Sequence, residues 1–431
     1  MLESLFKLKA NRTNVRTEIL AGITTALTCY YIIIVNALIL SEGGAPFEGV
    51  YVATIIAAAI SCFIMGFVAN YPIAVASGMG LNGFVAFTVC LGLGYSYVEA
   101  LGAVFVSGVL FVILSITGLR EKLVRSIPYT IKLSIAAAIG MFIALIGFEI
   151  GAVTVDHPAT LVTLGNIKDP TVILCLLGVV AVLALQHYKV RGSMIIVIVG
   201  LTVIGWITGL SDVPEKIISA PPPMELLFKL DIGAALSVGM LSTVGILLLV
   251  DVLDTSGTLL ACANAMGKVN KKGEVKGKGL GKAMLADSFG TVVGSLCGTT
   301  TQTSFIESGT GIREGGRTGL TAVVVGIMFL IALFFSQLAI SIPKWADAPI
   351  LIVVGFMFMS GIKDLDFSDV TEYAPALIAL FAVPFTYSIA VGIQLSILGF
   401  VILKTITGKS KQVSPALWVL AAACLGAFII S

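Results

Sequence analysis

The sequence contains little charge. Only 12% of its 431 residues are Asp, Glu, Lys or Arg, whereas about a quarter is usual in soluble domains. The formal net charge is +2, and the basic residues are spread over short loops, so the chain has no extended basic surface for a polyanion. These features exclude an ordinary soluble domain and argue against a nucleic-acid partner.

Residues and motifs of metal and enzyme sites are also scarce. The two histidines, His157 and His187, lie in loops or at the ends of apolar runs, so proton coupling would have to use carboxylates. The seven cysteines lie singly within apolar runs, without C-x-x-C spacing. No H-E-x-x-H, G-x-S-x-G or Walker motif is present. We therefore predict neither an enzyme, nor a metal site, nor a cofactor.

Apolar residues are abundant instead, making up 58% of the chain, with a mean hydropathy of +1.06. Apolar runs of about 20 residues recur between short polar breaks, as in membrane-spanning helices. We predict an all-α integral membrane protein with about 14 transmembrane helices. The expected spans are residues 17–40, 50–69, 73–92, 97–118, 129–150, 170–187 and 191–209, then 233–265, 281–297, 299–312, 317–337, 347–361, 372–406 and 413–431.

This division gives a basic leader (1–16), a seven-span repeat (17–209), an extracellular linker (210–232) and a second seven-span repeat (233–431). Residues 372–406 are too long for one straight span and contain Pro384. A single kinked span keeps the two halves equal and is favoured. The alternative is a helical hairpin, which would add a span and move the C-terminus to the other side.

Basic loops predict the orientation, because Lys and Arg favour the cytoplasmic side. The leader and the loops after the fourth, sixth and eighth spans are basic and fall on one side, so the N-terminus is expected in the cytoplasm of a plasma-membrane protein. Lys404, Lys409 and Lys411 contradict this pattern if residues 372–406 cross only once. At the same side, a charged cluster after the tenth span is interpreted either as an ion network or as a gate: Arg313, Glu314 and Arg317.

Two repeats with an odd number of spans must have opposite orientations, which is typical of transporters. The third span of each half, near residues 70–84 and 295–316, is interrupted by glycine. Broken helices at matching places indicate the binding site, and we expect them to face each other.

Three carboxylates lie where a membrane makes them costly. Asp251 and Asp254 belong to the eighth span and Glu307 to the tenth. A charge near the middle of the bilayer costs about 3 kcal/mol, so each is expected to face protein, water or ligand. The spacing of Asp251, Asp254 and Thr258 places them on one helix face, interpreted as a wall of the site. The alternative, that an aspartate only bonds a neighbouring helix, is favoured for Asp251.

Glu307 follows a run of small and hydroxyl residues, 298–304, which suits close approach of backbone and ligand. It is the residue most expected to bind substrate, with Thr303 and Ser308 beside it; a polar helix contact is the alternative. In the first half, residues 76–84 offer Gly80 for close approach, Asn82 as donor and acceptor, and Phe84 for stacking on a planar solute. The alternatives are a helix cap for Asn82 and plain packing for Phe84.

Several separated motifs resemble one family. They are residues 22–36, S-G-M-G-L-N at 77–82, D-x-x-D-T-x-G-T at 251–258, residues 286–291, and E-S-x-x-G-x-x-E-G-G-R-T-G at 307–319. Together they make the chain similar to the AzgA-type purine permeases of the nucleobase/cation symporter family, over nearly its whole length.

The resemblance implies a seven-plus-seven inverted repeat with a core domain (spans 1–4 and 8–11) and a gate domain (spans 5–7 and 12–14). It implies proton-coupled uptake of adenine, guanine or hypoxanthine, with Asp254 and Glu307 as purine-binding acids and Asn82 completing the site. Asp254, Asp251 and Glu307 are the candidates for proton coupling. The alternatives are a carrier of xanthine, urate or uracil, and an anion transporter on the same fold, against which the acids argue. The sequence does not decide between a monomer and a homodimer.

Overall fold

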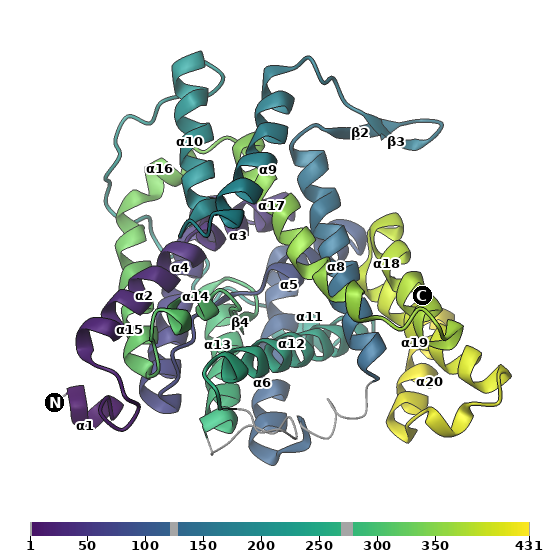
Figure 1. Cartoon of the computed structure of the whole chain (residues 1–431). Helices are drawn as coiled ribbons and strands as arrows, with labels where there is room; N and C mark the ends of the chain where they lie inside the picture. Colours follow the sequence, from purple (N-terminus) through teal and green to yellow (C-terminus); the bar gives the residue numbers. More distant parts are fainter. Residues whose placement is uncertain (1, 121–127, 269–278, 431) are drawn as a thin grey trace.

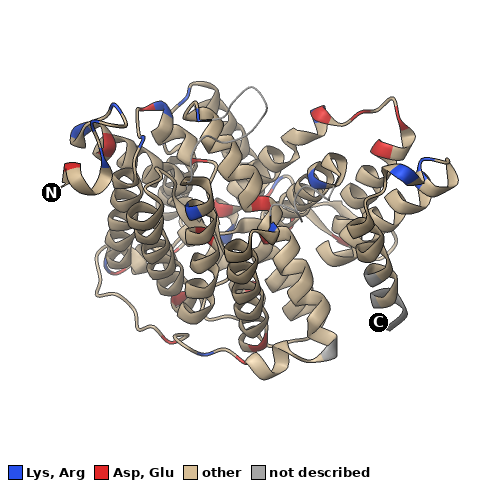
Figure 2. Ribbon diagram, turned by 90° about the horizontal axis from the view of Figure 1, so that it is seen from below, with Lys and Arg blue, Asp and Glu red and all other residues tan. Residues whose placement is uncertain are grey.

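The computed structural model describes residues 2–120, 128–268 and 279–430. Within these residues the chain is almost entirely helical, and nine helices are long and apolar enough to cross a membrane. Figure 2 shows long stretches of helix without charge, with most charged residues in loops and at helix ends. The predicted all-α membrane fold is confirmed.

The first half follows the predicted spans closely. Its helices are α1 (Leu2–Phe6), α2 (Val15–Cys29), α3 (Tyr31–Glu42), α4 (Phe47–Ile64), α5 (Met79–Gly83), α6 (Tyr97–Thr117), α8 (Tyr129–Ile150), α9 (Pro170–His187) and α10 (Ser193–Thr208). The π-helical segments η1 (Met65–Ala69) and η2 (Phe84–Gly92) extend α4 and α5. Strand β1 (Val75–Ser77) precedes α5, and β2 (Thr154–His157) pairs with β3 (Leu161–Leu164) after α8.

Local sequence determines where several of these helices begin. Asn14 caps α2 by accepting a hydrogen bond from the backbone N–H of Thr17. Ser96 and Glu99 form a capping box at the start of α6, and Asp169 caps α9, whose first residue is proline. Such caps satisfy backbone N–H groups that have no partner within the first helical turn.

The second half begins after a coil that joins α10 to α11. Its helices are α11 (Ile232–Ala235), α12 (Val238–Ala265), α13 (Gly279–Cys297), α14 (Ser308–Arg313), α15 (Gly319–Ala332), α16 (Ser336–Ile340), α17 (Lys344–Met359), α18 (Val370–Thr386), α19 (Ile389–Ile406) and α20 (Pro415–Ile430). Strand β4 (Gln302–Ser304) precedes α14, and short 3-10 segments are η3 (Leu333–Phe335), η4 (Ser360–Asp364) and η5 (Ser410–Gln412).

Residues 372–406 form a hairpin, so the single kinked span favoured by the sequence is wrong. Helix α18 ends at Thr386, and the next residue, Tyr387, has a φ of +53° that turns the chain back into α19. The hydroxyl of Thr130, at the start of α8, donates to Glu372, and that of Tyr387 donates to Glu149 near the end of α8. Helix α18 therefore runs the length of α8, and α19 returns.

The hairpin also removes the conflict over the basic residues near its end. The ammonium of Lys404 lies 2.5 Å from a carboxylate oxygen of Glu372, and that of Lys409 lies 2.6 Å from Asp369. Both lysines thus lie at the Thr130 end of α8, the side that the positive-inside rule assigns to the cytoplasm. Most of two further basic loops, residues 121–127 and 269–278, lies outside the described residues.

The helices pack in two groups. Helices α2, α4, α6, α13 and α15 contact one another, as do α8, α9, α17, α18 and α19. In Figure 1 the first group holds the N-terminus, and the second extends to α20 on the opposite side. Helices α8 and α17 cross closely: a Cβ atom at Gly140 would lie 2.6 Å from the carbonyl oxygen of Gly355. Small residues at such a crossing bring two backbones into contact, as is common in membranes.

Candidate binding site

The two broken segments meet within the first group of helices. Strands β1 and β4 pair in antiparallel register, with Val75 opposite Ser304 and Ser77 opposite Gln302. Because this non-helical backbone is fully buried, its N–H and C=O groups need partners, and the strand pairing supplies them. Helix α12 passes beside β4, α5 and α14. The expectation that the broken spans face each other is confirmed.

Glu307 is the residue that precedes α14. One of its carboxylate oxygens, Oε1, accepts a hydrogen bond of 2.8 Å from the hydroxyl of Tyr31 on α3. Tyr31 is 2% exposed, whereas Glu307 is only partly buried. The bond fixes one oxygen, and no other described side chain donates to the carboxylate. Tyr31 was not identified from the sequence, although a phenol hydroxyl within an apolar run could have indicated a polar contact there.

Asp254 lies on α12 within electrostatic reach of Glu307. It is partly buried, and no described side chain or backbone group donates a hydrogen bond to it. Thr258, one turn further along α12, is also partly buried. Asp254 and Glu307 therefore lie near each other, with carboxylate oxygens that remain free to accept hydrogen bonds.

Asp251 has a different environment, although it lies on the same helix. It is fully buried, and its Oδ2 accepts a hydrogen bond of 3.0 Å from Thr291 of α13. Nearby Asp287, which is also fully buried, accepts hydrogen bonds of 2.6 Å from Thr255 of α12 and Ser304 of β4. Asp287 thus joins α12, α13 and β4. It belongs to a motif of the resemblance, but sequence reasoning gave it no role in the site.

Arg120 lies close to these two aspartates. The sequence placed it in a cytoplasmic loop, but its side chain is 2% exposed and donates a hydrogen bond of 3.1 Å to the hydroxyl of Ser256 on α12. Its guanidinium lies 4.5 Å from the ring centre of Phe111 and within electrostatic reach of Asp251 and Asp287. A buried cation beside two buried carboxylates offsets part of the cost of removing them from water.

Asn82 connects the two broken segments. Its Oδ1 accepts hydrogen bonds from the hydroxyls of Ser77 and Thr300, and the whole residue is buried. Its Nδ2 has no partner among the described residues. The residue that caps α5 is Gly78, and Asn82 lies inside that helix, so the helix-cap alternative is wrong.

Thr303 and Ser308 are both buried close to the strand pair. The hydroxyl of Ser308 accepts a hydrogen bond of 2.9 Å from the backbone N–H of Ala74, just before β1. Thr303 lies opposite Ala76 in the register, and its methyl group would lie 2.9 Å from a Cβ atom at Gly78. Both residues hold the broken segments together in this conformation.

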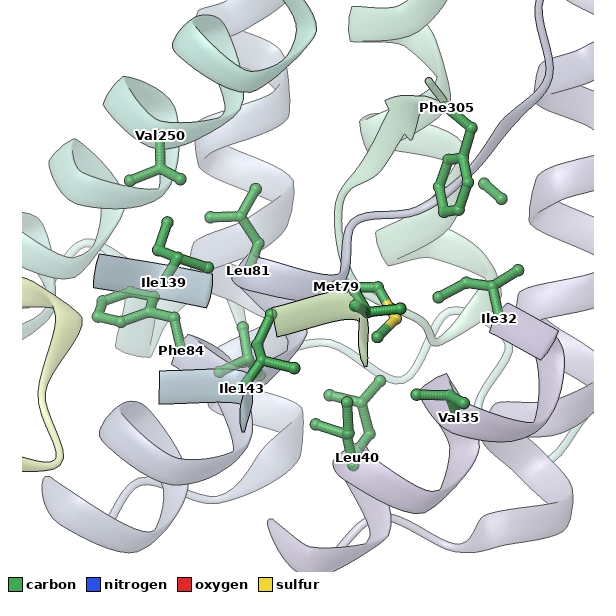
Figure 3. Packing of buried hydrophobic residues seen from close by; sticks show 14 of the residues in the cluster. Ile32, Val35, Leu40, Met79, Leu81, Phe84, Ile139, Ile143, Val250 and Phe305 are labelled. Carbon is green, nitrogen blue, oxygen red and sulfur yellow. The ribbon is translucent and has the colours of Figure 1, made fainter. Parts of the chain in front are cut away.

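Gly80 and Phe84 contact the second group of helices. A Cβ atom at Gly80 would lie 2.6 Å from the side chain of Ile139 on α8. Figure 3 shows the ring of Phe84 beside Ile139 and near Ile143, and the ring is 1% exposed. Gly80 thus permits close packing of α5 on α8. Phe84 packs in the apolar interior, the alternative that the sequence left open.

The arrangement can accept hydrogen bonds from a polar, uncharged solute. Free oxygens of Asp254 and Glu307 suit N–H groups, because hydrogen bonds to an ionised acceptor are stronger than neutral ones. In the part of the chain that the structure describes, no three His, Cys, Asp or Glu side chains are grouped to hold a metal ion.

The sequence is similar to those of known permeases over nearly its whole length. Residues 16–395 match a protein-family model described as the permease family. The guanine/hypoxanthine permease PbuO of Bacillus subtilis is 39% identical over 97% of this chain and 98% of its own length. The adenine permease AdeP of Escherichia coli is 37% identical over 98% of this chain and 94% of its own length.

A solved structure shares the fold at low sequence identity. The transmembrane domain of the cyanobacterial bicarbonate transporter BicA aligns with a TM-score of 0.66, covering 90% of this chain and 97% of that domain. The two sequences are 16% identical, so this likeness concerns the fold alone.

Proposed function

Because this chain belongs to the permease family, we propose that it is a secondary transporter that takes up purine nucleobases across the plasma membrane by proton symport. Two relatives that align over nearly the whole chain are named as guanine/hypoxanthine and adenine permeases. Family membership and the resemblance of the motifs also favour a transporter over an enzyme.

The observation that carries the substrate proposal is the pair of acids with free oxygens, Asp254 and Glu307. A purine presents N–H groups along its edges, and two neighbouring carboxylates can accept from them. An anion such as bicarbonate would instead need a site with net positive charge. The acids therefore favour a nucleobase, although the fold resembles that of a bicarbonate transporter.

The same pair of acids supports proton coupling. Two carboxylates near each other in a poorly hydrated site repel, and protonation of one of them relieves the repulsion. Binding of an uncharged base removes more water, which favours protonation further. Movement of the first group of helices against the second would then expose the loaded site to either side of the membrane, with the N-terminus in the cytoplasm.

The test is uptake into proteoliposomes containing the purified protein. Labelled hypoxanthine, guanine or adenine accumulates when the lumen is made alkaline, and unlabelled purines compete, whereas sulfate, bicarbonate and amino acids do not. Competition by xanthine, urate and uracil measures the alternative nucleobase specificities. Saturable bicarbonate or sulfate uptake without purine uptake contradicts the proposal.

The variant Asp254→Asn separates binding from coupling, because Asn keeps a hydrogen-bonding side chain but cannot titrate. We expect purine counterflow to persist and proton-driven accumulation to be lost. If the variant accumulates purine as the parent does, Asp254 is not the coupling residue.

A further inference from the structure

Asp347 is a carboxylate that the proposed transport mechanism does not use. It lies in the first turn of α17 and is fully buried. Neither of its oxygens has a hydrogen-bond partner among the described residues. An ionised carboxylate without a partner is very costly inside a protein, whereas its protonated form is much less so.

Other fully buried acids of the described chain differ from Asp347 in this respect. Glu18 accepts hydrogen bonds from the backbone N–H of Arg317 and from the hydroxyl of Thr321. Asp287 accepts two bonds and Asp251 one, and Arg120 lies nearby. Among the described residues Asp347 has no hydrogen-bond donor, and the nearby Lys344 pairs with Glu42 instead, so burial by itself favours the neutral form.

The neighbours of α17 show where Asp347 points. Trp345 lies against Gly205 of α10, Ala348 against Gly151 of α8, and Pro349 against Gly178 of α9. At 100° per residue, Asp347 lies on a different side of the helix from these three contacts. Among the described helices, α3 also packs against α17, and α3 in turn packs on α4 of the first group. Asp347 therefore lies at the boundary between the two groups of helices.

An ion pair crosses the same boundary one turn away. Lys344, the first residue of α17, pairs with Glu42 at the end of α3. Lys344 and Asp347 are three residues apart, a spacing at which side chains on a helix can meet. If α17 moved away from α3, Lys344 would lose Glu42 and would have Asp347 within reach.

The other ionisable groups of the helices around α17 are engaged elsewhere or uncharged. Glu149 of α8 accepts from Tyr387, and Asp169 before α9 accepts from Thr171. On α8 and α9, Tyr129, Lys132 and His187 lie towards the opposite ends of the helices. Cys175 of α9 packs at Gly151, and Tyr31 of α3 donates to Glu307. Helix α10 has no ionisable residue.

We propose that Asp347 is a proton-binding site at the boundary between α17 and α3, separate from Asp254 and Glu307. While α17 packs on α3, the carboxyl keeps its proton and Lys344 pairs with Glu42. When the helices separate, water reaches Asp347, its O–H bond breaks, and the proton passes to water. The carboxylate that forms then pairs with Lys344, and Glu42 becomes solvated. Low pH at this face thus stabilises the packed conformation.

The test compares Asp347→Asn, which imitates the protonated side chain, with the parent and with Asp156→Asn, an exposed control in the β2–β3 hairpin. The first measurement is the Tm of the purified protein between pH 5 and pH 8. The unfolded chain releases the Asp347 proton above about pH 4, so a parent that retains it loses stability as the pH rises. The Tm of Asp347→Asn therefore rises above that of the parent towards pH 8, and Asp156→Asn follows the parent.

The second measurement is purine counterflow over the same pH range, which rests on the proposed function. The rates of Asp347→Asn and the parent agree at low pH. At higher pH the parent becomes faster, by up to about tenfold per pH unit for one linked proton. Glu42→Gln frees Lys344 to pair with the Asp347 carboxylate, so the rise in rate moves to lower pH in this variant.

Each outcome separates the two proposals. If the parent shows no purine exchange, the transport proposal fails, and the Tm measurement still tests Asp347. A Tm difference that does not change with pH, or parallel rates for Asp347→Asn and the parent, contradicts the proton site. Failure of Asp347→Asn to fold at pH 8 also contradicts it, because a neutral side chain of the same shape should be accommodated.

Discussion

Asp251 and Asp254 are the same residue type, three positions apart on one helix, yet their surroundings differ. Asp251 is fully buried and accepts from Thr291, whereas Asp254 is partly buried and accepts from no described group. Side chains three positions apart on an α-helix point in directions that differ by about 60° around its axis, so they can face different neighbouring elements. One carboxylate therefore contacts α13, and the other remains open near Glu307.

The acids near the broken segments fall into two sets that differ in their hydrogen bonds. Asp251 and Asp287 have hydroxyl donors and connect helices, so we call them the bonded acids. Asp254 and Glu307 retain free oxygens near each other, so we call them the open acids. We expect the bonded acids to contribute mainly to stability and the open acids mainly to transport.

The largest effect is expected from removing a bonded acid. Asp287→Ala leaves the buried hydroxyls of Thr255 and Ser304 without their acceptor and should destabilise the fold by about 2 to 5 kcal/mol. The Tm of the purified protein and its expression level measure this. The matched control is Asp254→Ala on the partly buried side of α12, where the Tm should change little. Equal losses of Tm would remove the distinction between the two sets.

The next effect concerns binding by an open acid. Glu307→Gln keeps the shape and can still accept from Tyr31, but it loses the charge. Loss of a charge-assisted hydrogen bond should weaken purine binding by about 1.5 to 3 kcal/mol, roughly 10- to 150-fold. Calorimetry or a thermal-shift titration with purine measures the affinity. Unchanged purine affinity in a folded variant would place the substrate elsewhere.

Much of the fold was predictable because hydropathy is a property of local sequence. Apolar runs gave the spans, and the glycines and hydroxyl residues around Gly78 and Thr299 indicated the broken segments, which the structure pairs as β1 and β4. The hairpin of α18 and α19 was not predictable in the same way. Its apolar run is nearly continuous, and the reversal occurs at Tyr387, a residue type with no preference for positive φ.

The site was predictable in residue type but not in contacts. Polar side chains in apolar runs identified Asp254, Glu307 and Asn82, because a membrane makes such residues costly. Whether an acid is bonded or open depends on neighbours far away in sequence, such as Tyr31 for Glu307. Phe84 and Gly80 could be assigned to packing on α8 only once the position of that helix was known.

The smallest effect is expected from an acid outside the membrane, which tests whether partners alone make a carboxylate important for stability. Asp369 caps α18 through Thr371 and pairs with Lys409, and these hydrogen bonds, that from Lys409 foremost, hold the pKa of its carboxyl below the usual value. Asp369→Asn preserves the cap, since Asn caps helices as well as Asp does, and removes only the charge. Because a lowered pKa means that the folded state binds fewer protons, the parent should be slightly more stable than the variant above the unfolded pKa of about 4.

The Tm difference should be constant from pH 8 to pH 5, shrink below pH 4 as the parent carboxyl takes up a proton, and decrease in high salt. A difference as large as that of Asp287→Ala would show that burial does not distinguish these acids, and a difference that grows as the pH falls would reverse the assigned sign.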